Sequence, residues 1–320
     1  MDGAEQVLVR VHAVCVTPED VAFVRGELRD ITGPQPARAL GTVCTGTVAS
    51  AGGALAQGTR VAVLAPLVGR CSGGVCAELA VVPCSACVPL PVSLGFAKGA
   101  AAAYAGTAAL ELLHGALQPH RGDTLLVTAA SSPVGAAVVQ LAATQYGAAV
   151  LAAVDGPTAA ARIAVPGVRI VDVAQESIVG AVTAATRGLG AQHIADVALA
   201  PSPAQALAPR RAVQVLAPHG RWALCRTGVA LTAADTRLLR LKGAAVAFAG
   251  GPAWGAAPLH QGVRLHLLKR ALELAAAGAL DVPVAADGPR PLTAVNDVLA
   301  AVARDPDGPA EIVLLVPEEP

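Results

Sequence analysis

The sequence predicts an α/β protein made of a β-rich N-terminal part followed by a doubly wound parallel sheet covered by helices. Three observations support this. Short apolar runs separated by Gly and Pro fill residues 1–98. A strand–turn–helix–strand pattern follows at residues 124–155, and strands alternate with helices after it. Such alternation is typical of parallel sheets, whereas short strands joined by tight turns are typical of antiparallel ones.

The β-rich part is predicted from short runs that are too brief and too apolar for surface helices. Each run ends near Gly or Pro, which are common in turns between strands. The runs are VLVRVHAV (residues 7–14), VCTGTVASAGG (43–53), TRVAVLAP (59–66), CAELAVVP (76–83) and CVPLP (87–91).

The central stretch, residues 124–154, contains no charged residue and raises the question of a membrane span. SSPVG and QYG interrupt it, so we interpret it as several short secondary-structure elements. Residues 124–129 form a strand, residues 131–133 a turn, and residues 134–147 a helix that ends at Gly147. A second strand ends at Asp155. A parallel strand covered on both faces is a continuous apolar run, so we expect a βαβ unit rather than a span.

The pattern continues toward the C-terminus. Predicted strands cover residues 168–173, 193–200, 220–226, 244–250 and 310–317, and predicted helices cover residues 175–188 and 263–278. We expect the last strand to return to the β-rich part.

Composition excludes several other classes of protein. The chain has 320 residues with 23 basic and 23 acidic side chains, and no basic block indicates nucleic-acid binding. Acidic residues precede the first apolar run, unlike a signal peptide. The seven cysteines are irregularly spaced, which favours reduced thiols and a cytoplasmic location.

Several stretches together resemble the medium-chain dehydrogenase/reductase superfamily. They are VLVRVHAVCVTPED, LGTVCTGTVASAGG, GTRVAV, GGVCAELAVVP, VPLPVSLGFAKGAAAAYAGTAALELL, RGDTLLVTAASSPVGAAVVQLA and PAEIVLLVP. The segment from LLRLKG to AAAGAL, with Trp254 and a Gln-Gly before a helix, resembles the zinc-free quinone oxidoreductase-like branch related to zeta-crystallin.

This resemblance implies a GroES-like catalytic domain and a Rossmann domain that binds NADPH or NADH. The implied boundaries are 1–98 for the first part of the GroES-like domain, 99–284 for the Rossmann domain and 285–320 for the returning segment. Relatives begin with an additional β-hairpin, so the resemblance also implies that the first domain is truncated.

A dinucleotide requires free backbone amides at a helix start and close approach of the chain. The turn of this chain is Ala130, Ser131, Ser132, Pro133, Val134 and Gly135, preceded by Ala129. Only Gly135 remains of a G-x-G-x-x-G pattern. The family also accepts an Ala at the first position and, in some enoyl reductases, Ser at the middle one. Ser132 therefore either caps the helix or donates its hydroxyl to a phosphate, and the alternative is a helix cap without a ligand.

Asp155 ends the second strand of the unit, 20 residues after Gly135. An acidic residue there binds the ribose 2′-hydroxyl of NAD and would repel the 2′-phosphate of NADP. The sequence thus favours NADH locally, although the resembled branch usually takes NADPH. An ordinary turn Asp in DGP is the alternative.

In zinc-dependent relatives, a Cys stands at the position of Thr17. A Gly-His-Glu segment stands at Gly41-Thr42-Val43, so its His matches Thr42. Because Thr and Val are poor zinc ligands, no catalytic zinc is expected. Cys84 and Cys87 form a C-x-x-C, which we interpret as buried thiols rather than a metal site. Thr107 matches a position near the nicotinamide in relatives. No catalytic side chain is assigned.

Two functions follow. The first is a reductase of quinones or α,β-unsaturated carbonyls, which needs no strong acid–base residue because the cofactor carries the chemistry. The second is a catalytically eroded subunit of a multi-protein complex. Animal members of the branch are associated with an early-endosome complex that handles mRNA. Relatives also pair Rossmann edge strands into homodimers, and AAVAFAG is the candidate edge here.

Overall fold

The computed structural model describes residues 5–29, 40–65, 74–199, 207–226, 229–249 and 258–314. The chain forms two compact units, one made of residues 1–107 and 252–320 and the other of residues 108–251. The domain boundaries predicted after residues 98 and 284 remain a prediction. Among the described residues, no helix is both long and apolar enough to cross a membrane.

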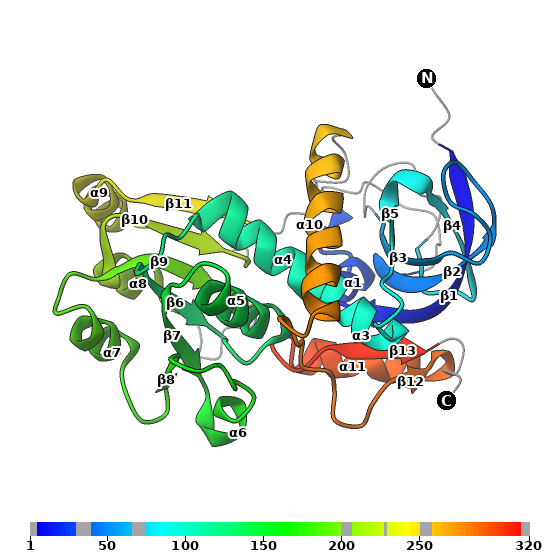
Figure 1. The fold of residues 1–320 in the computed structure, drawn as a ribbon. Helices are drawn as coiled ribbons and strands as arrows, with labels where there is room; N and C mark the ends of the chain where they lie inside the picture. Colours follow the sequence, from blue (N-terminus) through cyan, green and yellow to red (C-terminus); the bar gives the residue numbers. More distant parts are fainter. Residues whose placement is uncertain are drawn as a thin grey trace. The chain divides into compact units, whose positions relative to one another are not determined.

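The first unit is built on a mostly antiparallel sheet, as the sequence predicts (Figure 1). Its strands run in the order β12-β13-β1-β2-β3-β5, and β4 also pairs with β1. They are β1 (Gln6–Val16), β2 (Val43–Ser50), β3 (Arg60–Leu64), β4 (Leu79–Pro83), β5 (Cys87–Pro89), β12 (Arg290–Pro291) and β13 (Glu311–Leu314). β13 pairs antiparallel with β1, which confirms the predicted return of the last strand.

Valine forms most of the core of the first unit. Residues of β1 alternate between buried and more exposed positions, so Val7, Val9 and Val11 face inward. Helix α11 (Val295–Arg304) covers this core with Val298 and Val302. The other helical elements of this unit are α1 (Pro18–Val24), η1 (Cys84–Ala86), α3 (Phe96–Ala101), η2 (Ala102–Gly106), η5 (Leu292–Ala294) and α10 (Pro258–Ala276).

The second unit contains a six-stranded sheet whose strand pairs are all parallel. Its order is β11-β10-β9-β6-β7-β8, which is a doubly wound arrangement and confirms the predicted fold class. The strands are β6 (Thr124–Thr128), β7 (Ala149–Val154), β8 (Arg169–Asp172), β9 (Ala191–Asp196), β10 (Leu216–Leu224) and β11 (Ala245–Phe248).

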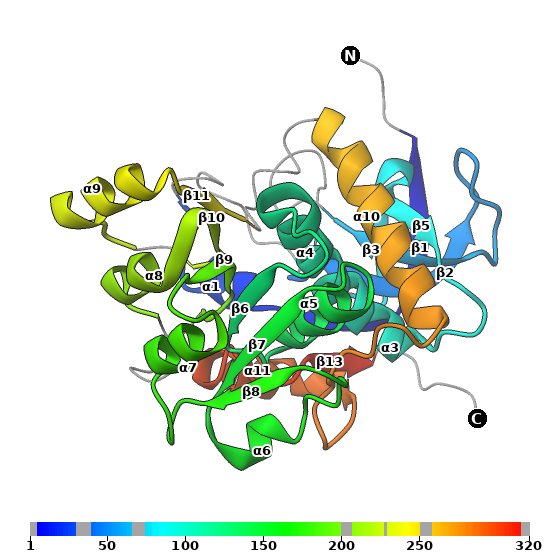
Figure 2. The ribbon, with the colours of Figure 1, turned by 60° about the vertical axis from the view of Figure 1, so that its left-hand side comes forward.

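Helices cover both faces of this sheet. On one face, α5 packs on β6 and β7 (Figure 1, Figure 2). The opposite face forms a core with three further helices, in which Leu126, Ile194 and Trp222 are fully or almost fully buried. The helices of the unit are α5 (Pro133–Thr144), α6 (Gly156–Ala160), α7 (Ile178–Ala185), α8 (Pro209–Val215), α9 (Ala233–Lys242) and η3 (Glu111–Leu117). α4 (Thr107–Leu110) lies at the division between the units.

The structure explains why residues 124–154 contain no charged side chain. β6 and β7 are covered on both faces, and α5 buries residues on nearly every side, including Ala136, Val139 and Leu141. A charged side chain at any of these positions would lose its hydration without a partner.

Lys242 fastens the last turn of α9 to the end of α8. Its Nζ donates to the carbonyls of Val213 (2.8 Å), Gln214 (3.0 Å) and Leu216. These carbonyls belong to the C-terminal end of α8 and the first residue of β10, where helical carbonyls lack partners within the helix. Burial lowers the pKa of Lys242.

We predict that Lys242→Met lowers the free energy of unfolding by about 1–3 kcal/mol, because three carbonyls lose a charged donor. Urea denaturation followed by tryptophan fluorescence measures this, since Trp222 is fully buried in the same unit. The matched control is Arg240→Met in the same helix, where we expect a change below about 0.5 kcal/mol. Equal stability of the two variants would contradict the role given to Lys242.

Candidate functional site: the turn between β6 and α5

The turn between β6 and α5 lies at the carboxyl ends of the parallel strands, where open α/β sheets bind ligands. Ser132 is the residue that caps α5, and Pro133 begins the helix. Pro fits this first position because its missing N–H has no partner in a helix start anyway. Ser131 and Ser132 are both buried, being 6 % and 4 % exposed.

Gly135 allows the helix start to approach the end of β6. A Cβ at this position would lie 2.2 Å from the carbonyl oxygen of Ala129, which is far inside contact distance. Ala129 itself adopts a left-handed conformation with φ of 43°, which is unfavourable for a residue with a side chain. Ala therefore stands at the first glycine position of the usual pattern, in a conformation that glycine adopts more readily.

Some backbone amides of this turn donate hydrogen bonds within the protein, and others are free. The Ala130 amide donates to the Ala153 carbonyl (3.0 Å), and the Ser132 amide donates to the Ala129 carbonyl (2.9 Å). The Gly135 amide donates to the Ser132 hydroxyl oxygen (3.1 Å). Within the described part of the chain, the amides of Ser131 and Val134 have no acceptor. Two amides at the start of a helix therefore remain to bind an anion.

Ser132 combines the two roles that the sequence left open. Its oxygen accepts the Gly135 amide and so caps the helix. A hydroxyl that accepts one hydrogen bond still has its proton to donate. The serine can therefore cap α5 and donate to a phosphate oxygen at the same time.

Asp155 follows β7 directly and is exposed. Its side chain does not cap α6, although it precedes that helix. The next residue is held by the neighbouring strand, since the Gly156 amide donates to the Asp172 carboxylate (3.1 Å). The Asp155 carboxylate has no partner among the described residues, so it is available to ribose hydroxyls.

Thr107 belongs to the first unit, whereas the turn and Asp155 belong to the second. Thr107 follows the π-helical turn η2, and π-helical turns are frequent at functional sites. Its side chain is almost fully buried, with 2 % exposed, and its Oγ1 has no hydrogen-bond partner among the described atoms. A buried hydroxyl without a partner is costly, which suits a group that bonds to a ligand.

Thr17 and Gly41, at the positions of the zinc-binding segments in relatives, are connected through Asp20. The Asp20 carboxylate accepts from the Thr17 amide (2.8 Å), the Thr17 hydroxyl (2.9 Å) and the Gly41 amide (3.1 Å). Burial raises the pKa of Asp20 to about 6, although these hydrogen bonds oppose the change. The Thr17 hydroxyl therefore serves a helix cap.

Backbone carbonyls accept from both thiols of the C-x-x-C pair. Cys84 donates its thiol proton to the Gly52 carbonyl, and Cys87 donates to the Pro83 carbonyl. In the part of the chain that the structure describes, no group of three or more His, Cys, Asp or Glu side chains is arranged to hold a metal ion.

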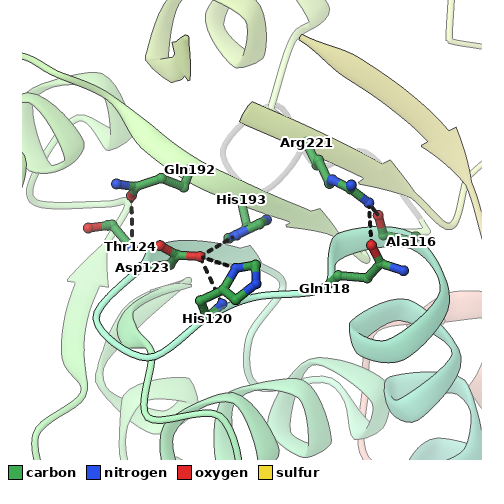
Figure 3. Close-up of polar contacts among 8 residues, drawn as sticks. All are labelled: Ala116, Gln118, His120, Asp123, Thr124, Gln192, His193 and Arg221. Atoms are coloured by element: carbon green, nitrogen blue, oxygen red, sulfur yellow. Dashed lines mark hydrogen bonds and ion pairs between the residues drawn. The ribbon is translucent and has the colours of Figure 1, made fainter. Parts of the chain in front are cut away.

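The opposite, amino-terminal edge of the same sheet carries a second polar cluster (Figure 3). Asp123, just before β6, accepts from the ring of His193 on β9 (2.9 Å) and lies 3.5 Å from the His120 ring. Arg221 on β10 stands in register with His193 and donates to Gln118 (2.9 Å) and the Ala116 carbonyl (3.3 Å). This cluster joins η3, β6, β9 and β10 at the edge away from the turn.

Charges in this cluster affect one another. Burial lowers the pKa of His193, and the Arg221 charge adds to this, while Asp123 opposes it. Burial raises the pKa of Asp123, but the His120 amide and the His193 ring outweigh burial, so the pKa of Asp123 is lowered overall. The Nδ1 atom of His193 is buried without a partner, so a proton there has no acceptor.

One group of side chains at the carboxyl edge could not be predicted from the sequence. It consists of Thr128, Asp196 and Arg226. They lie at the ends of three adjacent strands and are linked by hydrogen bonds. Asp196 and Arg226 are 30 residues apart in the chain, and only the strand order brings them together.

Comparison with known proteins shows what this chain is similar to. Residues 3–113 match the alcohol dehydrogenase GroES-like domain. A quinone oxidoreductase-like protein 2 homologue from Nematostella vectensis is 34 % identical over 200 residues, which cover 61 % of this chain and 52 % of that protein. The chain thus spans about half the length of this curated relative.

Solved structures share the fold across nearly the whole chain. An alcohol dehydrogenase superfamily protein from Novosphingobium aromaticivorans has a TM-score of 0.81 at 21 % identity, covering 97 % of this chain and 92 % of that one. A mycobacterial quinone oxidoreductase has a TM-score of 0.75 at 23 % identity, covering 98 % and 92 %. The predicted fold, with a GroES-like domain and a Rossmann-type parallel sheet, is confirmed, and the zinc-free branch remains a prediction.

We predict that His193 makes the protein sensitive to acid. Because its folded pKa lies below its ordinary value of 6.5, the unfolded chain binds more protons as the pH falls through this range. Stability is therefore present above about pH 6.5 and is lost below it. His193→Gln keeps an amide donor for Asp123 but does not titrate, so the melting temperature should fall less between pH 7 and pH 5.

The matched control is His120→Gln, because the His120 side chain is 87 % exposed beside the same carboxylate. This variant should keep the pH dependence of the unchanged protein. An unaltered pH dependence in His193→Gln would show that other groups determine the acid sensitivity.

Proposed function

We propose that this protein, with the fold of the medium-chain dehydrogenase/reductase superfamily, is a zinc-free NAD(P)H-dependent reductase of quinones or α,β-unsaturated carbonyls. The observation that carries the proposal is the β6–α5 turn, where Gly135 permits close approach and the Ser131 and Val134 amides are free. These are the features that a dinucleotide diphosphate requires. The quinone oxidoreductase-like relative supports the choice of substrate class.

Five of the predicted cofactor-binding residues have a task in this proposal. The amides of Ser131 and Val134 and the hydroxyl of Ser132 bind the diphosphate. The carboxylate of Asp155 accepts from ribose hydroxyls, and the hydroxyl of Thr107 bonds to the nicotinamide end. A bound nicotinamide supplies the hydride, and the reduced oxygen of the substrate takes its proton from water, so no strong acid is required.

The zinc-free assignment rests on residue types. Thr17, Thr42 and Val43 replace the Cys and His-Glu of zinc relatives, and the Thr17 hydroxyl is bonded to Asp20. Neither a threonine nor a valine offers the thiolate or imidazole that zinc prefers.

We also propose a homodimer formed through β11. This strand lies at an edge of the six-stranded sheet, and Phe248 on it is 70 % exposed. An unpaired strand edge with an exposed aromatic side chain is suited to pairing with a second copy.

The second candidate function is a catalytically eroded subunit of a multi-protein complex. One observation favours it: the Gly135 amide, which a glycine-rich turn could offer to a phosphate, is bonded to Ser132 instead. Absence of binding to both NADH and NADPH, measured by titration calorimetry, would select this function.

Thr107→Val tests the reductase proposal, because it should raise stability and lower turnover at the same time. Removal of a buried hydroxyl that lacks a partner should raise the stability of the ligand-free protein by about 1 kcal/mol. The same change should lower the turnover of NAD(P)H with a quinone at least about tenfold, because the hydroxyl binds the nicotinamide end. Thermal unfolding and steady-state kinetics measure the two effects.

The matched control is Thr144→Val, whose hydroxyl donates to the Gln140 carbonyl on the exposed side of α5. We expect turnover close to that of the unchanged protein. Full turnover in Thr107→Val would remove Thr107 from the site.

We predict that Asp155 makes the protein prefer NADH. Asp155→Asn removes a charge that repels a 2′-phosphate, so the ratio of NADPH to NADH affinity should rise about tenfold or more. Glu176→Gln is the control, because Glu176 is a partly exposed acid that pairs with Arg169 (3.1 Å). An unchanged ratio in Asp155→Asn would place the ribose elsewhere.

A further inference from the structure

Three side chains connect the carboxyl ends of β6, β9 and the segment after β10. The Thr128 hydroxyl donates to the Asp196 carboxylate (2.8 Å). Arg226 donates to the other oxygen of this carboxylate through Nε (3.3 Å) and Nη2 (3.2 Å). Arg226 also donates to the Leu207 carbonyl (2.8 Å), so it fastens the start of the segment that leads to α8.

The charges of this group are buried. The Asp196 side chain is fully buried, and the Arg226 side chain is 14 % exposed. Burial raises the pKa of Asp196, whereas the Arg226 charge and the hydrogen bonds from Thr128 and Arg226 oppose this. A buried carboxylate requires a partner of opposite charge, and removal of that partner leaves a charge without compensation.

This ion pair is connected to the turn of the candidate site through Thr128, whose hydroxyl donates to Asp196. Thr128 stands in register with Asp196, and the next residue is Ala129, where the left-handed turn begins. An ionised carboxylate at the same carboxyl edge of the sheet would repel an anion bound by the Ser131 and Val134 amides, since charges interact strongly where water is excluded. Arg226 neutralises this carboxylate.

We propose that Arg226 is a positioning residue for the dinucleotide diphosphate. It acts as the counter-charge of Asp196, so that the carboxyl edge of the sheet accepts an anion, and through Asp196 and Thr128 it holds the turn in place. This inference rests on the proposed cofactor function and adds a residue to that site.

Four variants test the proposal: Arg226→Met, Arg226→Lys, Asp196→Asn and the double variant Asp196→Asn/Arg226→Met. Titration calorimetry measures the affinity of each for NADH, for ADP and for adenosine, which lacks phosphate. Arg226→Met should bind NADH and ADP at least about tenfold more weakly, with adenosine affinity unchanged. Arg226→Lys keeps the charge and should bind ADP nearly as well as the unchanged protein.

The double variant separates charge from structure. Its Asp196→Asn change removes the negative charge that Arg226 otherwise offsets, so ADP affinity should return to within about threefold of the unchanged protein. The loss in Arg226→Met should also shrink in high salt, because ions screen the repulsion. If Arg226→Met fails to fold, the double variant and Arg226→Lys still give the comparison.

Two outcomes would overturn the inference while the proposed function stands. One is ADP affinity in Arg226→Met equal to that of the unchanged protein. The other is loss of ADP and adenosine together without recovery in the double variant, which would indicate a purely structural role. If the unchanged protein binds neither NADH nor NADPH, the proposed function itself fails, and this inference fails with it.

Discussion

Close approach between the end of β6 and the start of α5 is the constraint on which the rest of the site depends. A Cβ at Gly135 would lie 2.2 Å from the Ala129 carbonyl, so only glycine fits. This approach requires the left-handed conformation of Ala129, and the Ser132 side chain then caps the helix. Among the described residues, the amides of Ser131 and Val134 remain outside this network, at the carboxyl edge of the sheet where ligands of such folds bind. The same few residues thus determine both the local fold and the capacity to bind an anion.

The two edges of the six-stranded sheet use buried charge in different ways. At the amino-terminal edge, Asp123 and His193 connect strands to η3 in a cluster where burial lowers the pKa of His193 below its ordinary value. At the carboxyl edge, the Asp196 carboxylate is fully buried beside the guanidinium group of Arg226. The edge at which we propose that an anionic ligand binds therefore has a buried counter-charge. The amino-terminal edge instead has a titratable histidine, so its charge affects the stability of the protein.

Much of this arrangement could be predicted from the sequence, because it depends on local patterns. The uncharged run up to Asp155 indicated a βαβ unit, and Gly135, Pro133 and Ser132 identified the turn and its cap. The short runs before residue 98 gave the strands of the first unit, and the final strand returned as expected. The rest depends on partners that are distant in the chain. No local pattern shows that Arg226 reaches Asp196, that Lys242 caps α8, or that the Thr107 hydroxyl lacks a partner. The left-handed backbone conformation of Ala129 also could not be predicted, because alanine rarely adopts it.

Hydrogen–deuterium exchange of the turn tests most directly whether its free amides seat a diphosphate. The protein is compared alone and with saturating NADH or NADPH, and peptides that cover residues 129–136 are followed. The account predicts that exchange there slows at least about tenfold with cofactor, whereas residues 186–190 at the opposite edge keep their rates. Cofactor binding that leaves the exchange of residues 129–136 unchanged would place the diphosphate elsewhere and contradict the account.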